Sequence, residues 1–126
     1  MWEHCGVVRS EGGLTDGLRE LGEIREAAAV VDVRPGAEGW SDLAHALDLR
    51  AGLTVAEATL RCALERQESR GAQQRVDFPE LDPELAVNLH VDGRLEPSRE
   101  PVPPVPAELR SWLDRPVEPS ADRLLE

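Results

Sequence analysis

The sequence RCALERQESRGAQQRVDFP, residues 61–79, contains the end of the longest helical pattern in the chain. Gly71 is a natural place for this helix to stop, because glycine adopts positive φ at little steric cost. Pro79 prevents the helix from resuming, because a proline disfavours helical geometry in the residue before it. We therefore expect an abrupt helix end, at which Arg70 and Arg75 lie among several amide and carboxylate groups.

Two interpretations of this helix end remain open. Both rest on six residues that we call the ESRG corner: Glu68, Ser69, Arg70, Gly71, Arg75 and Asp77. In the structural interpretation, Arg70 and Arg75 satisfy the last helix carbonyls, which carry partial negative charge. In the other interpretation the same arginines bind an anion, because guanidinium groups match carboxylates and phosphates bidentately.

Composition limits the class of protein. The chain has 126 residues, enough for one domain with a modest core, and only 3% of them are aromatic, so Leu, Val and Ala must fill that core. With 14 basic and 25 acidic residues the net charge is −11, and we expect no attraction to nucleic acid or anionic lipid. No apolar run reaches the length of a membrane span and no secretory leader is recognisable, so we expect a cytoplasmic protein without direct membrane insertion.

Hydrophobic periodicity predicts a mainly α fold, a spectrin-repeat-like three-helix bundle over residues 1–79. The first helix would cover residues 1–9, with no N-cap before it. The second would begin at Thr15, after a break at residues 10–13, and would bury one apolar stripe: Leu14, Leu18, Leu21, Ile24, Ala28 and Val31. The third and central helix would begin at Ser41 or Asp42. Close helix contact would explain the glycines inside these helices: Gly17, Gly22 and Gly52.

The character of the chain changes after residue 79. Residues 86–91 alternate as a strand does, Asp92 and Gly93 form a tight-turn signal, and residues 94–96 would return as a second strand. Four prolines between residues 101 and 106 predict an extended segment, followed by a short helix at residues 107–113. We therefore expect residues 80–113 to form a hairpin and proline-rich segment that packs on the bundle, and residues 114–126 to form a flexible tail.

No complete active site is recognisable in the residues. The chain lacks a glycine-rich phosphate loop and contains no lysine. His4, His45 and His90 belong to three different segments, and the two cysteines, Cys5 and Cys62, have no zinc-site spacing. We therefore expect no catalytic, cofactor-binding or metal-binding residue in this chain, which leaves the ESRG corner as a docking or structural feature.

The corner and its flanks resemble a known family. ALERQESRGAQQRVDFPELDP, residues 63–83, resembles the C-terminal helical domain of the succinate dehydrogenase and fumarate reductase flavoproteins and of L-aspartate oxidase, in which ESRG-A-H-x-R precedes D-[FY]-P. MWEHCGVVRSEGGL, residues 1–14, is similar to the family's M-W-x-x-[VA]-G-[IV]-[VL]-R segment. The proline-rich REPVPPVP, residues 99–106, is similar to its closing segment, so the resemblance covers about residues 2–105.

The chain departs from the family pattern in two respects. Gln73 stands where the family usually has His, which removes a titratable group. The sequence also starts inside what is normally the first helix of that domain.

The resemblance implies a function that depends on a second part. In the family this domain follows an FAD-binding domain and a capping domain, which hold FAD and most substrate contacts. It implies a detached C-terminal domain of an FAD-dependent oxidoreductase, inactive alone, that docks onto an FAD-bearing subunit or domain and binds no cofactor itself. The ESRG corner would then serve structural docking rather than catalysis, and an exposed apolar docking face would favour self-association.

Two other functions stay open at this point. The chain could be a free-standing acidic protein-interaction module that has kept the bundle and lost the enzyme. A third hypothesis is that Arg70 and Arg75 bind a carboxylate ligand directly.

Overall fold

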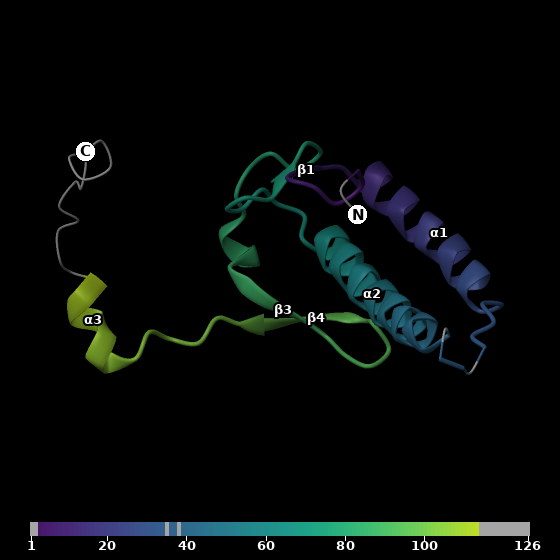
Figure 1. Cartoon of the computed structure of the whole chain (residues 1–126). Coiled ribbons are helices and arrows are strands. Elements are labelled where there is room, and N and C mark those ends of the chain that lie inside the picture. Colours follow the sequence, from purple (N-terminus) through teal and green to yellow (C-terminus); the bar gives the residue numbers. More distant parts are fainter. Residues whose placement is uncertain (1–2, 35, 38, 114–126) are drawn as a thin grey trace, which may run out of the picture.

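The computed structural model describes residues 3–34, 36–37 and 39–113. Two long helices dominate it: α1 (Glu11–Ala28) and α2 (Trp40–Glu65), which run side by side in opposite directions (Figure 1). A short helix, α3 (Ala107–Leu113), lies apart from this pair at the end of the proline-rich segment. The mainly α class expected from the sequence is confirmed.

The core lies between α1 and α2. Leu14, Leu60 and Ala63 form its buried centre, with Leu18, Leu21, Leu64 and Cys5 packed around them. Gly17 lets the chain approach closely here, because a Cβ at this position would lie 2.8 Å from the His4 Cβ. A Cβ added at Gly22 or Gly52 would meet nothing within 4 Å, so close contact explains only the first of these glycines.

An ion pair also joins the two helices. Glu57 on α2 is largely buried and pairs with Arg25 of α1 at 2.6 Å and with Arg61 at 2.7 Å. Burial by itself would raise the pKa of the Glu57 carboxyl, but the hydrogen bonds from Arg61 and Arg25 outweigh it and lower that pKa. The pair therefore fixes how α1 and α2 sit against each other.

The helix expected over residues 1–9 is wrong for the part described. Residues 3–7 form turns and bends, and Val8–Arg9 is a short strand, β1, that pairs in parallel with β2 (Gln74–Arg75). Backbone hydrogen bonds from Gln74 N to Val7 O and from Val76 N to Arg9 O, both 2.9 Å, hold this pairing. So short a segment cannot hold a helix by itself, and the long-range pairing decides its structure. The described fold is thus a packed helix pair rather than a three-helix bundle.

Both long helices begin earlier than expected. Ser10 is the N-cap of α1, and its hydroxyl accepts a hydrogen bond of 3.1 Å from Gly13 N. Gly12 and Gly13 therefore belong to the first helical turn, and the expected break before Thr15 is wrong. The α2 helix begins at Trp40, and its N-cap is Gly39, which has no side chain to cap the helix.

Residues 87–101 form a β-hairpin beside α2 (Figure 1). It follows a 3₁₀ turn at Pro83–Leu85 and consists of β3 (Val87–Val91) and β4 (Pro97–Pro101), paired antiparallel with Leu89 opposite Arg99. The return strand thus begins at residue 97, not 94. Asp92 explains the longer loop, because its carboxylate accepts hydrogen bonds from the backbone N–H of residues 94 and 96. Arg99 binds Glu65 of α2 at 2.8 Å and ties the hairpin to the helix pair. The expected tail, residues 114–126, lies outside the described residues.

Candidate functional site

The ESRG corner is centred on Glu68, whose side chain is completely buried. Its carboxylate accepts hydrogen bonds from Arg66 Nη1 at 2.7 Å and from Arg70 Nε and Nη2 at 2.7 and 3.0 Å. A fourth hydrogen bond of 3.0 Å comes from Asp82 N. The hydrogen bond from Arg70 is the main cause that lowers the pKa of Glu68 to about 2, against the opposing effect of burial.

Arg75 closes the end of α2. Its side chain is 3% exposed, and Nη1 donates to the carbonyls of Ala63 at 2.8 Å, Arg66 at 3.0 Å and, more weakly, Leu64 at 3.4 Å. These are carbonyls that the helix leaves without partners and that carry its partial negative charge. The Arg75 guanidinium also lies 4.9 Å from the centre of the Phe78 ring.

Asp77 connects Arg75 to the start of α1. Its carboxylate accepts from Arg75 Nε at 2.8 Å and Nη2 at 2.7 Å, a bidentate pair. The same carboxylate accepts a hydrogen bond of 2.9 Å from Glu11 N in the first turn of α1. Arg75 is the main cause that holds the pKa of Asp77 well below its usual range. One ion pair therefore joins the C-terminal end of α2 to the N-terminal end of α1.

The turn between the two ion pairs is itself closed by hydrogen bonds. Gly71 has φ of +58°, and Arg70 and Gln73 exchange backbone hydrogen bonds of 2.9 and 3.0 Å across it. The Ser69 hydroxyl accepts from Arg75 N at 2.9 Å and donates to Phe78 O at 2.9 Å.

These contacts favour the structural interpretation of the corner. All six residues that the sequence singled out come together, and the guanidinium groups of Arg70 and Arg75 are already bound to Glu68 and Asp77. An external anion would have to displace an internal carboxylate, so the contacts disfavour an anion site on these two arginines. Arg66 was missed by the sequence analysis, although it also donates to the carbonyls of Leu85 at 2.9 Å and Val87 at 2.8 Å. The sequence did offer one signal for Arg66: a basic residue at the end of a helix commonly binds nearby backbone carbonyls.

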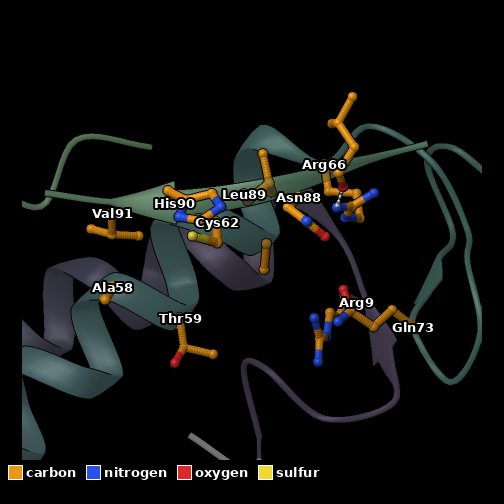
Figure 2. Close-up of a pocket in the computed structure, with 12 residues that line it drawn as sticks. Arg9, Ala58, Thr59, Cys62, Arg66, Gln73, Asn88, Leu89, His90 and Val91 are labelled. Carbon is orange, nitrogen blue, oxygen red and sulfur yellow. Dashed lines mark hydrogen bonds between the residues drawn. The ribbon is translucent and has the colours of Figure 1, made fainter. Parts of the chain in front are cut away.

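A second feature, the Arg9 groove, lies between α2, β1 and β3. It has a volume of about 620 Å³. Arg9 and Gln73 lie on one side of the hollow, and β3 with Asn88 and His90 lies on the other (Figure 2). Thr59 and Cys62 of α2 also line it, and burial is the main cause that raises the pKa of the Cys62 thiol.

The histidines of the described residues lie apart from one another and from the corner. His4 pairs with Glu20 at 3.0 Å and His90 with Glu100 at 3.2 Å, at separate places. Across residues 3–34, 36–37 and 39–113, His, Cys, Asp and Glu form no cluster of three that could hold a metal ion. Within the same residues, no helix is both long and apolar enough to cross a membrane.

Comparison with known proteins identifies the family. Residues 1–100 match the fumarate reductase flavoprotein C-terminal family. The chain belongs to this family. It is 31% identical over 83 residues to the fumarate reductase flavoprotein of Haemophilus influenzae, a match over 65% of this chain and 14% of that protein. It is 37% identical over 79 residues to L-aspartate oxidase of Pyrococcus furiosus, over 63% of this chain and 12% of the oxidase.

A solved structure agrees with this assignment. Quinol fumarate reductase FrdA of E. coli, in a mutant form, superimposes with a TM-score of 0.67 and 29% identity, over 79% of this chain and 18% of FrdA. The resemblance inferred from the sequence motifs is therefore confirmed. The chain spans less than a fifth of the length of these relatives.

Proposed function

We propose that the chain acts as a detached C-terminal domain of an FAD-dependent oxidoreductase of the succinate dehydrogenase and fumarate reductase type. It docks onto an FAD-bearing subunit or domain and does not catalyse alone. Family membership over residues 1–100 carries this proposal. Oxidoreductases of this kind depend on a redox cofactor, which side chains cannot replace, and we expect FAD to be held by the partner.

An exposed apolar face on α2 supports docking. One side of the helix, with Leu53 and Leu60, is buried against α1. A second row follows steps of four residues on another side of the helix, and we call it the apolar stripe: Leu47, Ala51 and Val55. Leu47 is 56% exposed and Val55 is 66% exposed. Exposed apolar surface of this kind marks protein interaction sites, and most of the length of each relative has no counterpart in this chain.

The ESRG corner plays a supporting part in this proposal. It fixes the end of α2 through Arg75 and so keeps the apolar stripe in one orientation. Arg70 is the corner residue whose side chain is still about one third exposed. A direct contact from Arg70 to the FAD-bearing part therefore remains a prediction.

Co-expression tests the proposal. The coding DNA upstream of the Met1 codon is read first, and an FAD-bearing reading frame found there is co-expressed with the tagged chain. We expect a complex that carries flavin absorbance through size-exclusion chromatography. The double variant Leu47→Glu, Val55→Glu should lose the complex while its far-UV circular dichroism stays unchanged, because charges replace exposed apolar groups. Ala27→Glu, at an exposed position of α1, is the matched control and should still bind.

Two results would count against docking through this stripe. The first is a double variant that binds the flavoprotein as tightly as the original chain. The second is a folded original chain that fails to bind the FAD-bearing polypeptide at all. Either the second result or the absence of an FAD-bearing frame beside the gene would favour the free-standing acidic interaction module instead.

A further inference from the structure

The Arg9 groove is unusual for this chain because no acidic residue lines it. Acidic residues make up 25 of the 126 in the sequence, yet none occurs among the twelve residues that line the groove. Two arginines do line it, Arg9 and Arg66. The groove is therefore a locally positive place on a protein whose net charge is −11.

The two arginines differ in what they already bind. Arg66 is neutralised by Glu68 at 2.7 Å, and its Nη1 and Nη2 also donate to the carbonyls of Leu85 and Val87. Arg9 donates Nε to Gly6 O at 2.6 Å, and neither of its terminal nitrogens has a partner among the described residues. No carboxylate within that part of the chain pairs with it. Arg9 thus brings an uncompensated cation to the groove.

Neutral donors line the same groove as this cation. Within the described residues, the side-chain amides of Gln73 and Asn88 make no hydrogen bond, and both line the groove (Figure 2). The backbone on the Arg9 side is fixed, because Arg9 O accepts from Val76 N at 2.9 Å in the β1–β2 pairing. Ala58 and Leu89 add apolar surface that hydrocarbon could contact. A held guanidinium with amide donors lining the same groove is suited to a carboxylate, which accepts two parallel hydrogen bonds from arginine.

We propose that the Arg9 groove binds a carboxylate, with Arg9 as its charged donor and the amides of Gln73 and Asn88 as its neutral donors. This site is separate from the ESRG corner, whose arginines already hold internal carboxylates. The carboxylate comes either from a small organic acid in solution or from an acidic side chain of another polypeptide. The proposal does not depend on docking to a flavoprotein. Because the groove is open to solvent, a simple carboxylate should bind with a Kd of about 1–10 mM.

An NMR titration of the full-length chain tests the site. Sodium acetate is added to ¹⁵N-labelled protein at constant ionic strength, and the backbone amide signals of Thr59, Gln73 and Leu89, which line the groove, are followed. We expect a saturable shift that disappears in Arg9→Gln. Arg34→Gln removes the same charge from a side chain that is 92% exposed and should leave the titration unchanged. Asn88→Ala, at an exposed position of β3, gives a second variant and should weaken binding a few-fold.

The source of the carboxylate is separated by a second series of ligands. Acetate and succinate are compared with a blocked tripeptide that has a central glutamate. Tighter binding of the peptide assigns the site to an acidic polypeptide, and tighter binding of a free acid assigns it to a small molecule. A glutamine tripeptide that binds as well as the glutamate one would overturn the proposal. So would the absence of saturation, or an unchanged titration in both Arg9→Gln and Asn88→Ala.

Discussion

Replacing Glu68 with Gln tests whether the buried ion pair holds the corner together. The change keeps the shape of the fully buried Glu68 side chain and removes its charge, which leaves the partly exposed Arg66 and Arg70 without this counter-ion. A pKa lowered from 4.5 to about 2 corresponds to about 3 kcal/mol in favour of the ionised carboxylate. Removing one partner of a buried pair costs a comparable amount, about 3–5 kcal/mol. We therefore expect E68Q to lower the free energy of unfolding by about 3 kcal/mol at pH 7.

The pH dependence gives an independent check on the same residue. Because the pKa of Glu68 is lower in the folded protein, its stabilisation is fully present above the unfolded pKa of 4.5. It is lost as pH falls from about 4.5 toward the folded pKa of about 2, since the unfolded state binds the proton first. The stability of E68Q should therefore fall less steeply over this range than that of the original chain.

Urea unfolding followed by circular dichroism measures both effects. Unfolding curves at pH 7 and at several lower pH values give the free energy of unfolding for each protein. Glu26→Gln, at an exposed position of α1, removes the same charge and should change stability by less than about 0.5 kcal/mol. If E68Q at pH 7 matched the Glu26→Gln control, or kept the full acid sensitivity of the original chain, the argument for a buried, ionised Glu68 would be refuted.

Three further predictions concern other parts of the fold. Arg75→Ala should lower the free energy of unfolding by about 3–5 kcal/mol and remove amide-exchange protection from the last turn of α2. The control Arg34→Ala should change neither quantity, and retained protection in Arg75→Ala would contradict the capping role of Arg75. Gly17→Ala should lower the melting temperature, because the new Cβ would lie 2.8 Å from His4 Cβ. Gly22→Ala has open space around it and should raise the free energy of unfolding by up to about 1 kcal/mol. Equal gains at both sites would show that the close contact between Gly17 and His4 is absent. The isolated chain should self-associate in sedimentation velocity through the apolar stripe, and the Leu47→Glu, Val55→Glu variant should not; a clean monomer at high concentration would argue against a docking face there.

The helical part of the fold was largely predictable from the sequence. Leu14, Leu18 and Leu21 repeat at helical spacing, and that period located α1 even though its start was placed four residues too late. The error came from reading Gly12 and Gly13 as a break, because glycine has low helix propensity. Ser10 overrides that propensity by satisfying a free N–H in the first turn.

The long-range pairing could not be predicted in the same way. Residues 3–9 carry a local pattern that suits a helix, and their partner strand, Gln74–Arg75, is more than sixty residues away. Local periodicity contains no information about such a partner, so the sequence pattern alone predicts a helix where β1 lies.

For the corner, composition and spacing found the right residues but not their environment. Glu68 lies within a run of charged and amide side chains, and charged residues are rarely fully buried unless they are paired. Nothing in the local pattern indicated that Arg66 and Arg70 would supply that pairing. The Arg9 groove was missed because its residues come from four separate stretches of sequence.

The hydrogen bond between Asp77 and Glu11 has a consequence for synthesis on the ribosome. It closes a loop of 66 residues, and β1 cannot pair until Gln74 and Arg75 have been made. Closure of so long a loop is slow compared with formation of the neighbouring helix pair. The nascent chain should therefore carry α1 and α2 as a loosely packed pair of helices until residue 77 leaves the exit tunnel. The two helix ends then lock together in a single late step, in which one carboxylate meets both of them.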